Sequence, residues 1–524
     1  MILEAIQKKK LTKDGLDKLK RTIAGGFKLP PPPTSSLNKA YHKLVKSKKI
    51  KPSADLELLL TRRAIRTLSG IAPITVLTKP APCPGQCVYC PTELTMPKSY
   101  ISNEPAAMRA LLLRFDPFAQ VTRRLQAMRD NGHPTDKIEL IVKGGTWSAY
   151  EWQYQKWFIK RCFDAANSFD AKRKSNKNLA QAQKINERAK NRIIGLTLET
   201  RPDWITPKEI QQLRELGCTR VELGAQSLDN KILDLVKRGH FTDWVIYATH
   251  LLKDAGFKVD YHMMPALPGS TPGKDIKMFK QLFEDDRYRP DMIKIYPCVI
   301  LPNSEIYQWW KTGRYKPWSE KTMIKTFAKI KSIIPRYVRI SRLIRDFPTP
   351  DVAAGTHISN LREAVQKEMR KHNLKCKCLR CREIGHNPDI DASKIKPKLF
   401  IKKYSASGGT EYFLSFEDPR RRVVFAFLRL RIPSPTNQAI LKTLPELKDC
   451  ALIRELHTYG HLVGLAKKSK LASQHKGLGK KLMKQAEQIV KKEKYKHIAV
   501  ISGIGVREYY KKLGYKLKDS YMIK

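Results

Sequence analysis

The sequence is poor in acidic residues and has no long apolar segment. It contains 49 Asp and Glu against 101 Lys and Arg, a formal net charge of +52. Surface ion-pair networks raise both signs together, so they do not explain this imbalance. No stretch approaches the roughly 18 apolar residues of a membrane span, and the N-terminus lacks the basic-then-apolar order of a signal peptide. We therefore expect a cytoplasmic protein with no membrane contact, whose charge is neutralised by a polyanion, usually nucleic acid.

Cysteine is too scarce for a disulfide framework. The 524 residues include 10 cysteines, of which six form two tight groups. Grouped cysteines in a chain without an export signal indicate metal binding in a reducing compartment. The scattered cysteines are best interpreted as small buried apolar residues. These are Cys162, Cys218, Cys298 and Cys450.

The chain divides into four predicted regions. Residues 1–70 form a basic helical arm, with 17 Lys or Arg against 5 Asp or Glu, that either tracks phosphates or is simply a solvated, partly disordered segment. Residues 71–345 alternate apolar runs with helical stretches, which predicts an α/β fold with a parallel sheet, open or curved into a partial (β/α)6 barrel. Residues 346–395 are a cysteine-containing linker, and residues 396–524 form a second α/β unit. The predicted strands of the first sheet are 74–77, 138–142, 194–198, 220–223, 259–263 and 292–296.

The first cysteine group, Cys83, Cys87 and Cys90, directly follows the first predicted strand. Three thiolates at this spacing can hold three irons of a 4Fe-4S cluster and leave the fourth iron open. A structural zinc ion is the weaker alternative, because it needs a fourth ligand and the next His or Cys is far away in sequence. A CxxxCxxC motif with an aromatic residue before the last cysteine is the signature of radical S-adenosylmethionine (SAM) enzymes, in which the open iron chelates SAM.

Polar residues follow the next predicted strands at the points where those strands end. The carboxyl ends of parallel strands meet at one edge of a sheet, where ligands bind, and glycines there let the backbone approach a ligand closely. Each residue alone could belong to an ordinary turn or a satisfied hydrogen bond. Together with the cysteines they predict a SAM pocket. The residues are Gly144, Gly145, Thr146, Glu199, Arg201 and Gln226.

The second cysteine group is Cys376, Cys378 and Cys381, in the basic linker. Three sulfurs within six residues, far from the first group, favour a structural zinc site. A second iron–sulfur cluster and metal-free thiols are the alternatives. The site would hold together a linker too small to bury a core of its own. The fourth ligand stays open among three histidines, His357, His372 and His386.

The last unit contains a glycine-rich turn, residues 474–479, that leads into an amphipathic helix. Such a turn offers backbone N–H groups and the positive end of a helix dipole to a pyrophosphate. Its Q-x-x-G-x-G form is that of the coenzyme A loop of GNAT acetyltransferases. Predicted strands at 451–457 and 497–501 flank the loop in the order of that fold. Tyr509 and Tyr510 follow at the place where the fold has a tyrosine near the thioester, so we expect them to be catalytic.

The combination of these motifs closely resembles the catalytic subunits of Elongator, of the stand-alone archaeal or bacterial type. The matching stretches are spread along the chain, at 83–91, 103–105, 144–146, 195–203, 454–457 and 509–510. The resemblance implies a carboxymethyluridine synthase that uses a 4Fe-4S cluster, SAM and acetyl-CoA on the wobble uridine in the anticodon stem-loop of tRNA. It also implies that Cys83, Cys87 and Cys90 hold the cluster. The implied acetyl-CoA contacts are Lys137, Glu455, Leu456, His457, Gly477, Leu478, Gly479 and Tyr509.

Two other functions compete with this one. A protein lysine acetyltransferase with a structural radical SAM domain needs only the last unit, but a lysine-bearing substrate would be repelled by the +52 charge. A non-catalytic tRNA-binding scaffold does not account for the intact cysteine and glycine motifs. The implied cluster requires an external electron donor. The sequence leaves open whether the chain forms a homodimer or joins accessory subunits.

Overall fold

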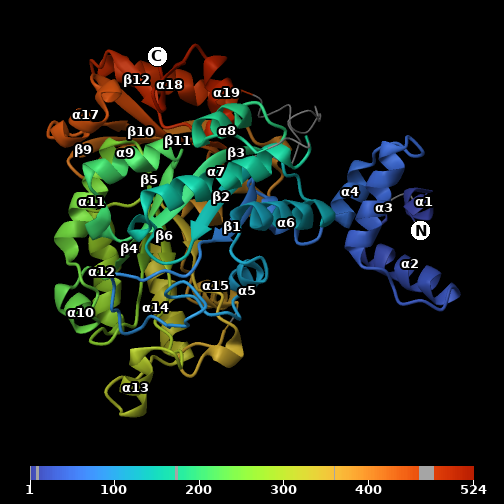
Figure 1. Cartoon of the computed structure of the whole chain (residues 1–524), viewed down its shortest axis with the longest axis horizontal. Coiled ribbons are helices and arrows are strands. Elements are labelled where there is room, and N and C mark those ends of the chain that lie inside the picture. The colour runs from blue at the N-terminus through green and yellow to red at the C-terminus, as the bar shows by residue number, and fades with distance from the viewer. Residues whose placement is uncertain (1, 8–10, 172–174, 359, 460–476) are drawn as a thin grey trace.

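The computed structural model describes residues 2–7, 11–171, 175–358, 360–459 and 477–524. Its main body contains two seven-stranded sheets (Figure 1). The first sheet is parallel throughout, in the order β1 to β7, and confirms the predicted radical SAM half-barrel. The six predicted strands are β1 to β6; β7 was not predicted, because Arg-Ile-Ser-Arg contains no apolar run. The bounds are Ala72–Leu77, Lys137–Lys143, Arg192–Thr200, Arg220–Gln226, Lys258–Met263, Met292–Ile295 and Arg339–Arg342.

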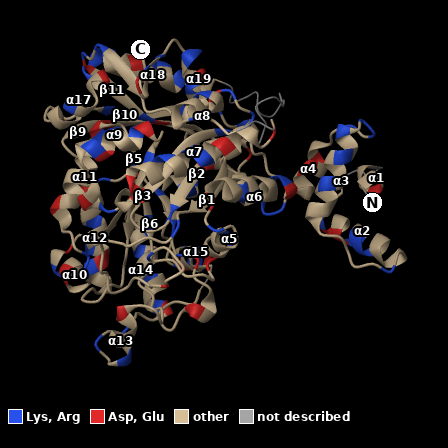
Figure 2. Ribbon diagram, in the orientation of Figure 1, with Lys and Arg blue, Asp and Glu red and all other residues tan. Residues whose placement is uncertain are grey.

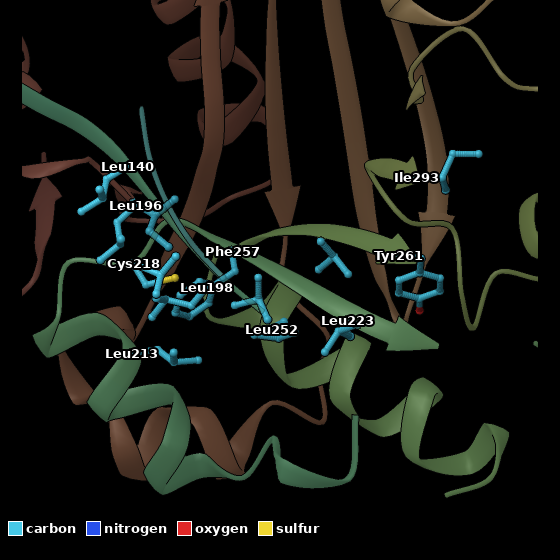
Figure 3. Close-up of a cluster of buried hydrophobic side chains, with 14 of the residues drawn as sticks. Leu140, Leu196, Leu198, Leu213, Cys218, Leu223, Leu252, Phe257, Tyr261 and Ile293 are labelled. Atoms are coloured by element: carbon cyan, nitrogen blue, oxygen red, sulfur yellow. The ribbon is translucent and has the colours of Figure 1, made fainter. Parts of the chain in front are cut away.

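Apolar and charged side chains alternate along β2, β4 and β5. Successive side chains of a strand point to opposite faces, so β2 turns Ile138, Leu140 and Val142 to one face. Its charged residues, together with Ile141, point to the other face. The apolar face packs against the surrounding helices, and Figure 3 shows Leu140, Leu223 and Tyr261 in this core. The four scattered cysteines are buried, as predicted. The charged face lines a cavity.

Ten helices from α5 to α14 accompany the first sheet. Several begin with a side chain that caps the backbone, followed by Pro, such as Asp116 before α6, Thr206 before α9 and Thr271 before α12. Their bounds are Pro105–Leu112, Pro117–Asp130, Trp152–Ser168, Leu179–Asn186, Pro207–Glu215, Asn230–Leu235, Thr242–Asp254, Pro272–Glu284, Glu305–Lys311 and Glu320–Ile333.

The second sheet has the order β13-β14-β12-β11-β10-β9-β8, with β11 and β12 parallel and the other pairs antiparallel. The predicted strands at 451–457 and 497–501 are β11 and β12, and the predicted helix is α18, which packs on β10 and β11. The strand bounds from β8 are Lys398–Ala406, Gly409–Glu417, Val424–Ile432, Cys450–Thr458, His497–Val500, Lys516–Lys518 and Tyr521–Ile523. The helices are α17 Gln438–Thr443, α18 Leu478–Lys492 and α19 Arg507–Lys511.

The second sheet lies against the amino ends of the first-sheet strands. A Cβ atom on Gly505 would come within 2.9 Å of the Ile193 carbonyl oxygen at the start of β3. Nη1 of Arg454 donates to the Phe257 carbonyl, just before β5, at 2.6 Å. The cysteine loop follows the opposite, carboxyl end of β1. The half-barrel therefore separates the cysteine loop from the second sheet (Figure 1).

The N-terminal segment is helical and lies to one side of the body (Figure 1). Its apolar residues, including Leu16, Leu37 and Tyr41, form a separate small core, while basic residues recur along α2 and α3 (Figure 2). Asn38 joins it to the body by donating to the carbonyls of Arg129 and Asp130 at 3.2 Å. The helices are α1 Ile2–Gln7, α2 Lys13–Gly26, α3 Thr34–Lys46 and α4 Ala54–Leu60.

The linker packs on the outside of the half-barrel. Helix α15 (Leu361–Lys371) contacts α14, and α16 (Leu379–Arg382) contacts β7, where Leu379 N–H donates to the Val338 carbonyl at 2.9 Å. The second cysteine group is therefore anchored to the last strand of the half-barrel. Among the described residues, no helix combines the length and the apolar character needed to cross a bilayer.

Candidate active site

A single cavity of about 2630 Å³ extends along the charged face of the half-barrel, from the cysteine loop to the second sheet. It exceeds the roughly 300–1,000 Å³ of a typical small-molecule pocket. Almost all of the residues predicted to bind cofactors or to be catalytic line it; Gly144 and the second cysteine group do not. The lining residues of the predicted set are Cys83, Cys87, Cys90, Lys137, Gly145, Thr146, Glu199, Arg201, Gln226, Glu455, Leu456, His457, Gly477, Leu478, Gly479, Tyr509 and Tyr510.

The cysteine loop places its three sulfurs along the wall of the cavity. Among the described residues, Cys83, Cys87 and Cys90 do not gather within 4.8 Å of one another as the ligands of a single ion would. A 4Fe-4S cluster instead takes one thiolate on each of three irons. A Cβ atom on Gly85 would lie 3.7 Å from the Sγ atoms of both Cys83 and Cys87, so the glycine keeps the space between them free. The residues fit a 4Fe-4S cluster.

Two arginines approach this loop from the half-barrel. Nη1 of Arg238 donates to Cys87 Sγ at 3.5 Å, and Nη2 to the Gly224 carbonyl at 2.6 Å. A hydrogen bond from Cys90, together with Arg238, holds the pKa of the Cys87 thiol well below its ordinary value, which favours the thiolate that binds iron. Arg238 was not predicted, because no motif marks the turn after α10. Arg201 binds Asp203 through Nε and Nη2 at 2.9 and 2.8 Å.

Two polar atoms at the strand ends are buried without a hydrogen-bond partner in the described part of the chain. They are Nη1 of Arg201 and Oε1 of Gln226, and both side chains line the cavity. Buried polar groups rarely lack partners, so these atoms suit a polar cofactor such as SAM. Nearby, Thr146 Oγ1 lies 3.7 Å from Cys83 Sγ. Gly144 has φ +131°, and a Cβ atom there would collide with the Thr78 hydroxyl.

A cluster of charged side chains lies in the cavity, between the cysteine loop and the second sheet. Only one of its residues was predicted from the sequence. The ligand-type atoms of Glu199, Glu222 and His262 all lie within 4.8 Å of one another. His262 Nδ1 is 3.2 Å from Glu199, and Nε2 is 3.0 Å from Glu222. Lys143 and Lys294 both contact Glu222. Burial alone would raise the pKa of Glu222, but the two lysines outweigh it and hold that pKa well below its ordinary value.

Only Glu199 of this cluster was predicted as a site residue. The other charged residues stand inside strands: Glu222 in β4, His262 in β5 and Lys294 in β6. Buried parallel strands are usually apolar on both faces. Charged residues at alternate positions were therefore the signal that one face borders a polar cavity.

At the other end of the cavity, Glu455, Leu456 and His457 lie on β11. Glu455 accepts from Arg429 Nε at 2.8 Å. Burial opposes its ionisation, but Lys258 and Arg429 lower its pKa to about 2. His457 packs against Tyr459 with ring centroids 4.4 Å apart, and its buried Nε2 has no partner among the described residues. This free nitrogen suits a polar ligand in the cavity.

The glycine-rich loop is described from Gly477 onward; Gln474, His475 and Lys476 lie outside the described residues. Gly477 has φ +95° and directly precedes α18, a conformation that glycine adopts without strain. The Tyr509 hydroxyl would lie 3.2 Å from a Cβ atom on Gly479. Lys137 is the first residue of β2. Tyr510 packs edge-on against Tyr515 in the hydrophobic core beside the second sheet. Among the described residues, no side chain caps the start of α18, so its first backbone N–H groups suit the pyrophosphate of acetyl-CoA.

The second cysteine group forms a compact site outside the cavity. The Sγ atoms of Cys376, Cys378 and Cys381 lie within 4.8 Å of one another, as zinc ligands do. No described His, Cys, Asp or Glu completes a tetrahedron with them at that distance. Of the three candidate histidines, His372 pairs with Glu368 at 3.2 Å and is exposed. His357 and His386 line the cavity instead.

The fold and the site define a radical SAM protein joined to an acetyltransferase domain. Family models agree: the Radical SAM superfamily matches residues 82–282, the Radical_SAM C-terminal domain residues 290–371, and the Acetyltransferase (GNAT) domain residues 453–523. A relative from Methanocaldococcus infernus, called tRNA uridine(34) acetyltransferase, is 48% identical over 88% of this chain and 87% of its own length. Elongator complex protein 3 of Homo sapiens is 38% identical over 89% and 86%.

The chain belongs to the Elongator complex protein 3 family, which confirms the resemblance seen in its motifs. A relative from Dehalococcoides mccartyi, also called tRNA uridine(34) acetyltransferase, is 44% identical over 88% of this chain and 99% of its own length. The solved structure of archaeal Elp3 from M. infernus, with an N-terminal deletion of residues 1–46, matches with a TM-score of 0.75 at 44% identity. It covers 87% of this chain and 99% of that one.

Proposed function

We propose that this chain attaches a carboxymethyl group to carbon 5 of the wobble uridine of tRNA, with SAM and acetyl-CoA as cosubstrates. The observation that carries the proposal is the single cavity that joins the cysteine loop to the glycine-rich loop. Two separate activities would not need a shared cavity. The names of the relatives, tRNA uridine(34) acetyltransferase, support uridine 34 as the target.

The two ends of the cavity have different tasks in this proposal. Cys83, Cys87 and Cys90 would hold the cluster, and the strand-end residues Arg201 and Gln226 would bind SAM. When bound, the cluster and SAM supply a radical that can take a hydrogen atom from the methyl group of acetyl-CoA, a step that no amino-acid side chain provides. The unpartnered Nε2 of His457 and the backbone around Gly477 would hold the thioester at the other end.

Carbon 5 of uracil has no acidic proton and no leaving group, so a carbon unit is difficult to attach there by acid–base chemistry. In the overall reaction the electron that cleavage of SAM would take up is matched by the electron released when the C5 hydrogen leaves as a proton, so no net electron is consumed. Hydrolysis of the thioester by water would then leave the carboxymethyl group. The anticodon base has to leave its stack to enter.

The proposal also includes the division of the chain into regions and the roles of residues outside the two loops. The proposed region limits are 1–70, 71–345, 346–395 and 396–524, with tRNA contacts in the first and a structural zinc ion on Cys376, Cys378 and Cys381. The catalytic roles of Tyr509 and Tyr510, an external electron donor, a homodimer and a cytoplasmic location are also proposed. All ten cysteines are free of disulfides, which suits a reducing compartment.

The test is anaerobic incubation of the reconstituted protein with SAM, acetyl-CoA, a reductant and tRNA, followed by nucleoside mass analysis. We expect a mass gain on uridine that matches carboxymethyl. Cys87→Ala should abolish that gain while tRNA affinity stays within about twofold, because the cluster supplies the radical. The matched control is Cys162→Ala, which changes a buried cysteine of α7 outside the cavity and should keep the activity.

Unchanged modification by Cys87→Ala would contradict the radical chemistry. Acetylated protein lysines without any change in tRNA mass would favour a lysine acetyltransferase instead.

A further inference from the structure

Three arginines beside the first strand of the half-barrel have no counter-ion. Arg66 belongs to the short 3-10 helix η1 (Ala64–Thr67), Arg109 to α5 and Arg124 to α6, and all three line the cavity. Within the described residues, none of their guanidinium groups forms a hydrogen bond or an ion pair. Some other arginines of the cavity are paired: Arg220 lies 2.6 Å from Glu139, and Arg345 lies 2.9 Å from Glu104.

The three guanidinium groups lie close enough to affect one another. Burial, followed by the charges of Arg109 and Arg66, lowers the pKa of Arg124 to about 10. Burial and then the charge of Arg66 lower the pKa of Arg109 in the same way. Three like charges without an acidic neighbour repel each other, and an anion bound among them would relieve that repulsion.

The arginines lie at one edge of the first sheet. β1 is an edge strand of the first sheet, and η1, α5 and α6 all pack against it. The N-terminal helical segment touches the last turn of the same α6, where Lys39 lies 3.0 Å from Asp130. α6 therefore lies between the basic arm and the half-barrel (Figure 1).

We propose that Arg66, Arg109 and Arg124 form a phosphate-binding site for the RNA backbone next to the uridine that enters the cavity. The identification of RNA as the ligand of this site rests on the proposed function. Arginine suits this task because its planar fork binds phosphate oxygens through two parallel hydrogen bonds. The phosphates of coenzyme A share this chemistry, so the experiment must distinguish the two sources.

The experiment measures tRNA affinity of the full chain at several salt concentrations, for wild type and for Arg109→Gln, Arg124→Gln and the double variant. Each phosphate contact contributes about 0.7–0.9 to the slope of log affinity against log salt. We expect each single variant to lose roughly that amount, and the double variant roughly twice as much. The matched control is Arg123→Gln, the same charge change on an exposed residue of α6 that does not line the cavity; its slope should stay closer to that of wild type.

Stability provides a second readout that separates binding from folding. Removing an unpaired, partly buried charge should leave the melting temperature of the free protein unchanged or raise it. Affinity for tRNA should fall at the same time. Arg124→Lys serves as the conservative variant. If Arg124→Gln lowers both the tRNA affinity and the melting temperature, and Arg124→Lys lowers neither, the arginine is structural. That result would overturn the proposal.

Two further results would overturn it. Slopes of Arg109→Gln and Arg124→Gln equal to that of Arg123→Gln would show that RNA does not contact the site. Weaker acetyl-CoA binding with unchanged tRNA binding would assign the arginines to the phosphates of coenzyme A. Because these readouts are binding constants, they stay informative even if the wild-type protein fails to modify uridine, a result that would contradict only the proposed function.

Discussion

The ion pair between Asp291 and Arg454 connects the half-barrel to the strand that carries Glu455. Asp291 directly precedes β6, and its two carboxylate oxygens accept from Arg454 at 2.6 and 2.8 Å. In the pairing of β10 with β11, Arg429 faces Glu455 and Leu430 faces Ile453, so Arg454 is the extra residue of a β-bulge. Both side chains of the pair are fully buried. We expect Asp291→Asn to disturb the acetyl-CoA end of the cavity from the opposite domain.

The magnitude follows from the burial of the pair. Removing one partner of a buried ion pair costs about 3–5 kcal/mol. Glu411 still accepts from Arg454 at 3.0 Å in the variant, so we expect the lower limit, about 3 kcal/mol of unfolding free energy. If about half of the lost stabilisation is lost at the β-bulge beside Glu455, the free energy of acetyl-CoA binding falls by about 1.4 kcal/mol. Acetyl-CoA binding then weakens roughly tenfold. Denaturant unfolding and calorimetric titration with acetyl-CoA measure the two effects.

The control is Asp254→Asn, which breaks an equally buried pair between the domains. Asp254 lies 2.7 Å from Arg431, but Arg431 is on β10 and does not line the cavity. This variant should lose comparable stability and retain its affinity for acetyl-CoA. Equal affinity losses in both variants would indicate general loosening. A destabilised Asp291→Asn with unchanged acetyl-CoA affinity would refute the argument that the bulge transmits the effect.

Two further predictions concern the arm and a buried carboxyl group. Deletion of residues 1–60 should weaken tRNA binding and reduce its salt dependence, because basic residues that contact phosphates are removed; an unchanged slope would show that the arm does not bind tRNA. Burial raises the pKa of Asp275 to about 6, so its charge opposes folding above that pH and not below about 4. Relative to Asp275→Asn, the wild type should therefore lose up to about 3 kcal/mol of unfolding free energy between pH 4 and pH 7; a pH-independent difference in denaturant unfolding would contradict this pKa.

The sequence predicted elements whose signal is local. β1 to β6 contain apolar runs, the cysteine loop is a spaced motif, and α18 has an apolar face that begins after a glycine turn. β7 was missed because its four residues include two arginines. The order of motifs correctly indicated two linked domains. The cavity that connects the cysteine loop to the glycine-rich loop is visible only in three dimensions.

Residues that act across the fold left no local signal. Arg238 reaches Cys87 across 151 positions of sequence, and Arg454 reaches Asp291 across 163. Each is one arginine among many in a basic chain. The fourth ligand of the second cysteine group illustrates the same limit, since three histidines were near in sequence and none of them joins the three sulfurs within 4.8 Å.

Charged and apolar residues alternate along β2, β4 and β5, and the charged residues face the cavity. Several acidic residues on the inner face have basic partners there, as Glu139 has Arg220 and Glu222 has Lys294. The inner face therefore contributes little to the net charge of +52. The uncompensated positive charge lies elsewhere, and it includes the arginines beside β1, such as Arg124, which border the same cavity. A polyanion would thus be attracted to the edge of the sheet beside β1. The adjoining cavity, where Glu139 and Glu222 have basic partners, could receive an uncharged base.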